Sequence, residues 1–423
     1  MFDIPQLHAH TTLLPRLPAL AKLLPARKGA IAWLREGRGF IAAGQAARFD
    51  QAPSQGDTRF TRASQWWNKV LESAEVDDNV RGPATGLLGV GSFSFAGNSP
   101  VGSALIIPQV VVGYDGERGW LTVIGPANQD ATLSSHAQAL VDSALGHSTF
   151  QYRGHGAARV LPTDTDAHRN AVVAIKERIG NGEVAKVVLA RKLDVQTDGE
   201  IDERHIVKRL ARTYPHTWTF AVDGLVGATP ELLAQTQGRT VRVRVLAGTV
   251  PRSGPNAIEK LQSSGKDAIE HKLAVDSVVS ELEKVGTVEV GATFVLELPN
   301  VFHLATEVRA DLHTDATALD VAGILHPTAA LGGTPTREAL NVIADLEGID
   351  RERYGAPVGW LDARGGQWCV ALRCARIHGN RATAFAGGGI LADSDPDAEF
   401  SETVAKFVPM LDALGVSRAE LQE

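Results

Sequence analysis

TWTFAVDGLVGATPELLAQTQGRTVRVRVL, residues 217–246, is the stretch that decides the fold class. It predicts three antiparallel strands in succession, because apolar runs of strand length follow one another at short intervals. The last run, TVRVRV, alternates apolar and polar residues with the period of two that is typical of a strand with one buried face. Strands joined this closely indicate an antiparallel sheet, since parallel strands need long crossover connections.

The segments on both sides of this stretch mix helices and strands. Apolar periodicity predicts helices at 58–76, 131–145, a helix that ends at Gly180, and helices at 201–214, 266–285, 317–325, 336–346 and 396–413. Strands are expected within 30–44 and 85–124, at 183–195, and near 293–308, 357–377 and 382–390. This mixed order, rich in hairpins, predicts an α+β fold with large, mainly antiparallel sheets and helices on their outer faces. The segment 150–165 is the best candidate for a linker between two halves of the chain.

Composition excludes several classes of protein. The 423 residues are 44% hydrophobic and 22% charged, and the formal net charge is -7, so nucleic acid is not the expected partner. The N-terminus has no secretory signal pattern, and no apolar run approaches the roughly 20 residues of a membrane span. Cys369 and Cys374 fall in one predicted strand, QWCVALRCARI, on opposite faces. Without a disulfide framework, the protein is expected in the cytoplasm.

The final predicted helix carries two acidic residues and a lysine on one face. Asp395 suits the cap and Pro396 the first helical position. Glu399, Glu402 and Lys406 then stand at i, i+3 and i+7, apart from the apolar stripe of the helix.

The helix at 266–285 offers a similar pair, Asp267 and Glu270, near its start. Brought together, the two pairs would place four carboxylates in one site, where only a cation could offset their repulsion. Oxygen ligands alone favour Mg²⁺. The ordinary alternative is that acidic residues complement helix dipoles, with Ser264 and Asp267 as part of a capping box. Spacing alone favours this alternative.

Three further residues have two interpretations each. Lys186, inside the apolar run VAKVVLA, is either an edge-strand residue or a partly buried base with a depressed pKa, and the edge position is favoured from the pattern alone. Glu231 follows Pro230 in GATPELLA and is either a turn residue or a buried acid with a raised pKa. Arg373 is equally well a carboxylate clamp or part of a strand-face ion pair.

Nine short segments occur in an order that resembles the chorismate-binding enzyme family. They are KVVLAR (186–191), GATPELL (227–233), LAGT (246–249), KDAIEHKLAV (266–275), LHPTAALGGTP (325–335), RYGAPVGW (353–360), LRCAR (372–376), AGGGIL (386–391) and SDPDAEFSETVAK (394–406). Each motif is weak alone, whereas nine in the family's order are specific. The resemblance covers roughly 165–415, the motif-rich catalytic half. It implies one compact domain over 1–423, in which residues 1–150 are the variable half.

The resemblance implies a site that binds chorismate with Mg²⁺. Glu270 and Glu402 would ligate the metal directly, and Asp267 and Glu399 would act through water. The family often has Glu where Asp267 stands. The residues implied for substrate binding are Gly248, Thr249, Ala330, Tyr354, Leu372, Arg373, Gly387 and Lys406, of which Arg373, Tyr354 and Lys406 would hold the enolpyruvyl carboxylate.

Four residues distinguish the activities of the family. Lys186 matches the base that activates water in isochorismate and salicylate synthases, and Glu231 matches the acid that protonates the departing hydroxyl. To accept a proton, Lys186 must be neutral, so its pKa is expected to be depressed. Ala247 counts against the aminodeoxychorismate synthases that carry a nucleophilic lysine there. Ala330 favours isochorismate over salicylate synthase, which tends to have Thr at that position.

The sequence therefore predicts an isochorismate synthase that resembles those of menaquinone and siderophore pathways. Salicylate synthase is the alternative, followed by an anthranilate synthase component or a chorismate binder without catalysis. The expected partner is the small molecule chorismate, with no nucleic acid and no membrane, and the resemblance implies a monomer.

Overall fold

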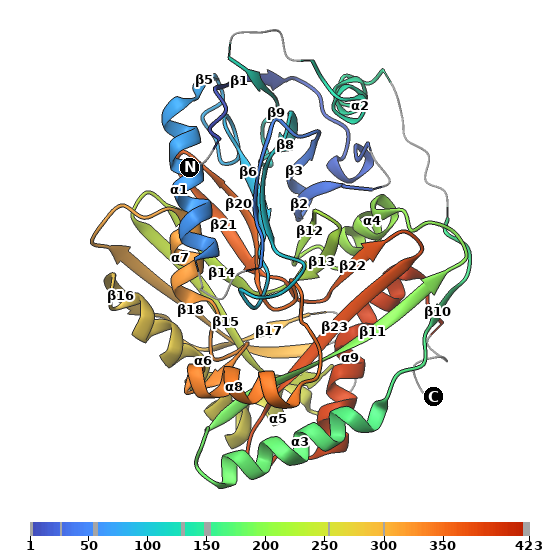
Figure 1. The fold of residues 1–423 in the computed structure, drawn as a ribbon, viewed down its shortest axis with the longest axis vertical. Helices are drawn as coiled ribbons and strands as arrows, with labels where there is room; N and C mark the ends of the chain where they lie inside the picture. The colour runs from blue at the N-terminus through green and yellow to red at the C-terminus, as the bar shows by residue number, and fades with distance from the viewer. Residues whose placement is uncertain are drawn as a thin grey trace.

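Two large sheets dominate the computed structural model, which describes residues 3–25, 28–53, 58–127, 132–147, 154–252, 254–298 and 301–417 (Figure 1). Within these residues, the first sheet has 13 strands and the second has 10. Every strand pair described is antiparallel except the pairing of β1 with β5. The predicted α+β class with mainly antiparallel sheets is confirmed.

The first sheet mixes strands from both halves of the chain. Its order is β10 (Ala158–Val160), β11 (Lys186–Thr197), β23 (Arg381–Ile390), β22 (Cys374–His378), β13 (Leu225–Thr229), β12 (Trp218–Val222), β2 (Ile31–Arg35), β3 (Arg38–Ala43), β8 (Val110–Tyr114), β9 (Gly119–Pro126), β1 (Leu7–Leu14) and β5 (Glu75–Asp78), with β19 (Gly333–Thr334) beside β11. The join between the halves is the antiparallel pair of β12 and β2.

The second sheet is mixed in the same way. Its order is β16 (Gly286–Val290), β18 (Val301–Leu312), β15 (Thr240–Pro251), β14 (Leu232–Gln237), β21 (Gly365–Val370), β20 (Pro357–Asp362), β6 (Gly89–Ser92), β7 (Ser103–Ile107) and β4 (Ala47–Gln51), with β17 (Phe294–Glu297) beside β18. Here β20 pairs with β6 from the N-terminal half.

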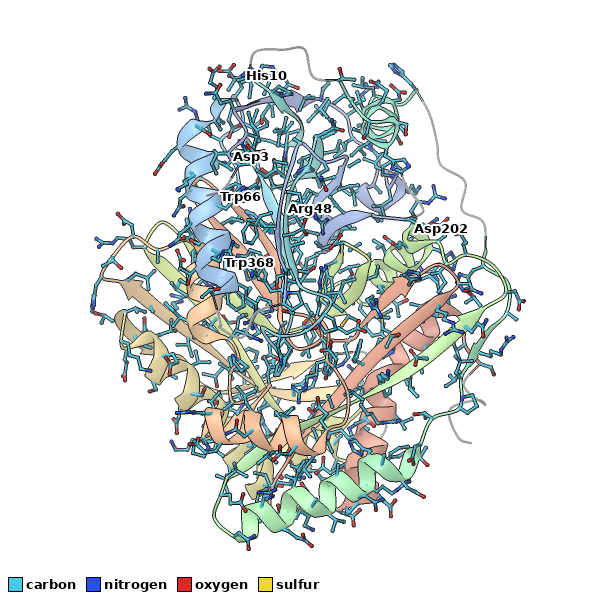
Figure 2. The ribbon with its side chains drawn as sticks, viewed as in Figure 1. Asp3, His10, Arg48, Trp66, Asp202 and Trp368 are labelled. Carbon is cyan, nitrogen blue, oxygen red and sulfur yellow. The ribbon has the colours of Figure 1, made fainter. Side chains whose placement is uncertain are left out.

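The main core lies between the two sheets. The Trp33 indole of β2 donates a 2.8 Å hydrogen bond to Gln367 Oε1 of β21, and Phe40 of β3 meets Trp360 of β20 edge to face. Figure 2 shows Trp66 and Trp368 in the interior of the molecule, and the side chain of Trp368 is fully buried. Burying large aromatic side chains on both inner faces holds the sheets together.

Helices cover the outer faces. The first sheet carries α2 (Ser135–Ala144), α3 (Thr165–Gly180), α4 (Glu203–Thr213) and α9 (Pro396–Leu414), while α8 (Thr336–Leu346) packs on β11. The second sheet carries α5 (Ala257–Ser263), α6 (Gly265–Leu282) and α7 (Ala318–Leu325), with α1 (Arg59–Ser73) against α7 and β4. A short 3-10 turn spans Leu20–Lys22. Among the residues described, no helix is both long and apolar enough to cross a membrane.

Several predictions about strands were wrong. Residues 217–246 form four strands, not three, because the chain passes from the first sheet to the second at Pro230–Glu231. The cysteine-containing run is also two strands in different sheets, β21 and β22, and both cysteines are buried and free. Strand β5 occupies the predicted end of the 58–76 helix, and β16 was not expected.

The predicted linker at 150–165 is contradicted in part. Residues 150–153 lie outside the described residues, but 158–160 form β10, which pairs with β11 at the edge of the first sheet. Each sheet contains strands of both halves, which meet at one strand pair (β12 with β2, and β20 with β6), so this segment does not separate two sheets.

Candidate active site

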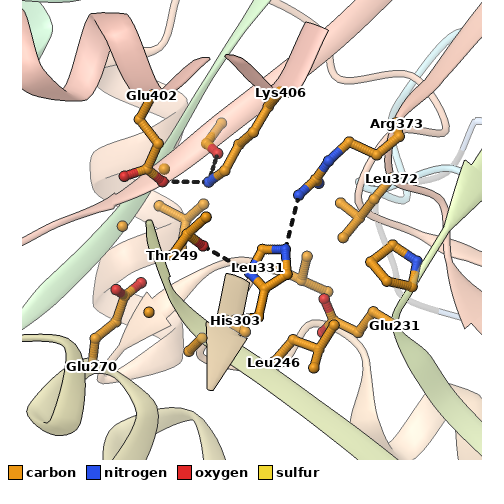
Figure 3. Close-up of a pocket in the computed structure, with 18 of the residues that line it drawn as sticks. Glu231, Leu246, Thr249, Glu270, His303, Leu331, Leu372, Arg373, Glu402 and Lys406 are labelled. Atoms are coloured by element: carbon orange, nitrogen blue, oxygen red, sulfur yellow. Dashed lines mark hydrogen bonds and ion pairs between the residues drawn. The ribbon is translucent and has the colours of Figure 1, made fainter. Parts of the chain in front are cut away.

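A pocket lies between the two sheets near α6 and α9, with about 650 Å³ of empty space, part of it open to solvent (Figure 3). It gathers residues that are far apart in the sequence. Of the fourteen residues predicted for the site, eleven line this pocket: Glu231, Gly248, Thr249, Glu270, Ala330, Tyr354, Leu372, Arg373, Gly387, Glu402 and Lys406. The other three, Lys186, Asp267 and Glu399, lie directly behind its lining.

Two places where the chain crosses between the sheets each deliver a charged side chain. Glu231 stands between β13 and β14, and Arg373 stands between β21 and β22. The crossings are tied together, because Val370 N donates to Glu231 O at 3.1 Å and Ala228 N donates to Arg373 O at 3.2 Å. Arg373 has a φ of 48°, a left-handed conformation that is unusual for a side chain of this size. Strain of this kind clusters at functional sites.

Glu231 is held as a protonated acid. Its side chain is buried, and burial raises the pKa of its carboxyl to about 8, although the positive charges of Arg373, Lys186 and Lys406 act in the opposite direction. A carboxyl with such a pKa keeps its proton at neutral pH and can donate it to a leaving group.

Arg373, His303 and Thr249 form a chain across the pocket (Figure 3). Arg373 Nη2 lies 3.5 Å from His303 Nε2, and His303 Nδ1 lies 2.9 Å from Thr249 Oγ1. Burial and then the charges of Arg373 and Lys406 hold the pKa of His303 well below its usual value, so the ring is neutral. Since a guanidinium only donates, Nε2 accepts and the proton resides on Nδ1, directed at the threonine hydroxyl.

Lys186 is completely buried, so its predicted position at a sheet edge was wrong. Strand β11 has β23 on one side and β10 and β19 on the other. The Lys186 ammonium lies 3.0 Å from Glu270 Oε1, but within the described residues it makes no well-directed hydrogen bond. Burial alone would raise the pKa of Glu270, whereas Lys186, Lys406 and Lys266 together lower it.

The glycine run of β23 makes room for this pair. A Cβ atom at Gly389 would lie 2.4 Å from Glu270 Oε1 and 2.6 Å from Lys186 Cε. At Gly388 it would lie 3.3 Å from Glu399 Oε2 and 3.5 Å from Glu402 Oε1. These glycines therefore continue a regular strand, not a bend, and their missing side chains leave space for acidic groups from both helices.

The predicted caps of the two acidic helices are present. The Asp395 carboxylate accepts from the backbone of the first turn of α9, with Pro396 at the first position. Ser264 Oγ accepts from Asp267 N at the start of α6. Both helices are therefore capped at the predicted residues, and their N-termini bring the acids to the same pocket.

Each of three carboxylates in this cluster contacts a lysine. Besides the contact of Glu270 with Lys186, Lys266 Nζ lies 2.9 Å from Glu399 Oε1, and Lys406 Nζ lies 2.5 Å from Glu402 Oε1. Lys406 also donates to Gly387 O at 2.8 Å. The Lys406 ammonium, which was predicted to bind substrate, is therefore directed at α9 and β23 in this structure.

The four carboxylates are close enough to interact electrostatically. Burial first, and then repulsion by Glu402, raises the pKa of Glu399, while burial followed by Glu270 and Glu402 raises that of Asp267. As they stand, no three His, Cys, Asp or Glu side chains among the described residues form a ready metal site. The donors are all carboxylate oxygens, which fits a hard cation such as Mg²⁺, provided that it replaces lysine contacts.

The comparisons with known proteins identify the family. A family model described as chorismate binding enzyme matches residues 18–415. The chain belongs to the chorismate-binding enzyme family. Isochorismate synthase EntC of Escherichia coli (strain K12) is 30% identical over 392 residues, which cover 90% of this chain and 93% of that protein. MenF of Mycobacterium tuberculosis (strain H37Rv) is 40% identical over 260 residues, covering 56% and 70%.

Solved structures show the same fold. The structure of MenF, the menaquinone-specific isochorismate synthase from Escherichia coli, matches with a TM-score of 0.76 at 23% identity, covering 97% of this chain and 95% of that chain.

An anthranilate synthase component 1 from Thermococcus kodakarensis is also a relative of this chorismate-binding enzyme, 36% identical over 62% of this chain and 63% of that protein.

Several pocket residues were not predicted from the sequence. His303 lies in β18 within an apolar run, VFHLATEV, and a polar ring in such a run was the available signal. Leu246 and Leu331 add apolar walls, and Arg351 closes the floor towards α8. Apolar and structural residues of this kind have no local pattern that distinguishes them from core.

Proposed function

We propose that this protein is an isochorismate synthase, which converts chorismate to isochorismate. The observation that carries the proposal is a buried lysine and a buried acid on opposite sides of one pocket. Figure 3 shows Glu231 and Glu270 on opposite sides, and Lys186 lies 3.0 Å from Glu270. The 30% identity to an isochorismate synthase over nine-tenths of the chain supports the assignment.

The proposed reaction adds water at ring carbon 2 and removes the hydroxyl at carbon 4. The Lys186 amine accepts a proton from the attacking water, the ring double bonds shift, and the C4–O bond breaks. Glu231 donates its proton to the departing oxygen, so that one water enters and one leaves. Because both proton transfers take place in a buried site, the two groups need opposite protonation states, and the raised pKa of Glu231 supplies one of them.

The cation site of the proposal uses the two acidic helices. Glu270 and Glu402 would hold Mg²⁺ directly, and Asp267 and Glu399 would do so through water. When bound, Mg²⁺ would offset the negative charge of the ring carboxylate and orient it. Arg373, Tyr354 and Lys406 would bind the enolpyruvyl carboxylate, which requires Lys406 to exchange Glu402 for substrate.

Smaller groups complete the proposed substrate site. Gly248, Thr249 and Gly387 bring backbone close to the substrate, and all three line the pocket. Ala330 and Leu372 also line it and would limit the position of the ring.

Salicylate synthase is the alternative, since the same base and acid would form isochorismate before pyruvate is eliminated. The small side chain of Ala330 favours a reaction that stops at isochorismate. An anthranilate synthase activity is less favoured although a relative has that name, because Lys186 occupies the position of a water-activating base. A chorismate binder without catalysis would have no use for Lys186 and Glu231 together.

Product analysis tests the proposal. The purified protein is incubated with chorismate and MgCl₂ near neutral pH, and the products are separated by chromatography. Isochorismate without pyruvate is the expected result. Formation of salicylate and pyruvate would instead identify a salicylate synthase. Tight binding of chorismate without its conversion would identify a binding protein.

We further propose that the enzyme acts as a cytoplasmic monomer in a menaquinone or siderophore pathway. Both cysteines are free and buried, which suits a reducing compartment. Sedimentation of the purified protein should give the mass of one 45.0 kDa chain.

A further inference from the structure

Lys266 joins the two acidic helices, although it does not line the pocket. It stands in the first turn of α6, and its Nζ donates a 2.9 Å hydrogen bond to Glu399 Oε1 of α9. The Glu399 side chain is only 3% exposed, and Ser394 Oγ also donates to its Oε1 at 2.6 Å. Lys266 also interacts electrostatically with Glu402 and Glu270. It is therefore a cation built into the acidic cluster.

Lys266 lowers the negative charge of the cluster by one unit. With Lys186 neutral, as its role as base requires, four carboxylates (Asp267, Glu270, Glu399 and Glu402) and two charged lysines (Lys266 and Lys406) give minus four plus two, a net charge of -2. A divalent cation would bring this to 0. Without Lys266 the two values would be -3 and -1, so the lysine weakens the attraction of the cluster for a cation.

We infer that Lys266 is a positioning residue and built-in counter-ion, which holds Glu399 and the two acidic helices in place without metal and limits the affinity for Mg²⁺. The inference rests on the cation site of the proposed function. A buried carboxylate such as Glu399 is costly when unpaired, so the lysine stabilises the metal-free fold. The same charge repels the incoming cation, so its removal strengthens cation binding.

The test is titration of MgCl₂ into substrate-free protein, followed by calorimetry and by thermal unfolding at constant ionic strength. Lys266→Met is compared with Lys272→Met, a matched control on the same helix whose lysine pairs with Asp276 and is exposed. The dissociation constant for Mg²⁺ should fall by roughly tenfold in Lys266→Met, from the Coulomb attraction of two nearby charges. Its unfolding temperature should be lowered without Mg²⁺ and recover at saturating Mg²⁺. The control should match wild type in both.

An unchanged or weaker Mg²⁺ affinity in Lys266→Met would overturn the inference, because a purely structural bridge lowers stability with and without metal. If Lys266→Met does not fold, Lys266→Gln removes the charge and keeps a hydrogen-bond donor, with the same expected tightening. Wild-type protein that binds no Mg²⁺ would overturn both the cation site and the role of Lys266. Normal Mg²⁺ binding without isochorismate formation would overturn the proposed function alone.

Discussion

Two buried ion pairs border the same pocket and differ in how completely they are satisfied. Arg351 binds both oxygens of Glu347, at 2.7 and 2.6 Å, and also donates to Leu331 O and Val188 O. Glu347 in turn accepts from Ala190 N at 2.7 Å. The other pair, Lys186 with Glu270, has one contact of 3.0 Å and no well-directed hydrogen bond from the lysine among the described residues.

The difference indicates different roles. Arg351 and Glu347 fix the backbone of pocket-lining residues from α8, and a fully hydrogen-bonded buried pair resists change. Lys186 is as deeply buried but keeps donor capacity unused, and an unsatisfied buried polar group needs a functional explanation. The first pair is expected to determine stability, and the second to determine turnover.

The largest effect is expected at Lys186. In Lys186→Ala, turnover should fall by about 10³- to 10⁴-fold, roughly 4–5.5 kcal/mol, because the proposed mechanism assigns the acceptance of the proton of water to this amine. Its circular dichroism and its Mg²⁺-dependent chorismate binding should be retained. Lys192→Ala, an exposed lysine on the same strand, serves as the control. Near-normal turnover in Lys186→Ala would show that Lys186 is not the base.

Disrupting the Arg351–Glu347 pair should mainly lower stability, whereas disrupting the Lys186 pair should mainly lower turnover. Arg351→Met should lower the free energy of unfolding by roughly 3–5 kcal/mol, since it leaves the Glu347 charge buried without its partner. Chemical denaturation measures this, and Arg337→Met, an exposed position on α8, should show almost no change. A loss below about 1 kcal/mol, the range of surface pairs, would contradict the contrast between the two pairs.

Glu402 and Lys406 are expected to belong with the functional pair. Glu402→Gln should weaken the Mg²⁺ response and chorismate affinity together, each by roughly 10- to 100-fold, as for groups that hold or orient a metal. The measurement is KM for chorismate across a Mg²⁺ titration. Loss of chorismate affinity with an unchanged Mg²⁺ response would instead assign Glu402 to the substrate alone.

The pH dependence tests Glu231 with a smaller effect. The acid must be protonated to act, and burial raises its pKa to about 8, so kcat/KM should fall about tenfold per pH unit above that value. Because the folded pKa exceeds the ordinary 4.5, the folded state retains the proton longer, and stability from this group is lost as pH rises from 4.5 to about 8. Glu231→Gln should therefore gain stability relative to wild type over this range. A stability difference that does not vary with pH would contradict the raised pKa.

The sequence predicted the fold class and most of the residues that line the candidate pocket, because these depend on local signals. Alternation in TVRVRV and the caps of α6 and α9 are local, and the order of nine motifs identified the family. The crossings at Glu231 and Arg373 were not predicted, since an apolar run reads the same whether it stays in one sheet or changes sheets. The burial of Lys186 depends on β19 and β23, which are distant in sequence.

The pairing of acids with lysines was beyond sequence reasoning for the same reason. Lys266 and Glu399 are 133 residues apart, and only the convergence of two helices brings them together. The presence of strands from both halves in each sheet also supports our proposal that residues 1–423 form one domain, which the motifs alone implied only by resemblance.

The most direct test of the central claim is the source of the new hydroxyl. Chorismate is converted in water enriched in ¹⁸O with Mg²⁺ present, and the product is examined by mass spectrometry and carbon NMR. The proposal predicts isochorismate that carries one ¹⁸O atom at ring carbon 2, and none of this product from Lys186→Ala. Isochorismate without the label would show that the C4 hydroxyl migrates within the substrate, and would contradict water activation by Lys186.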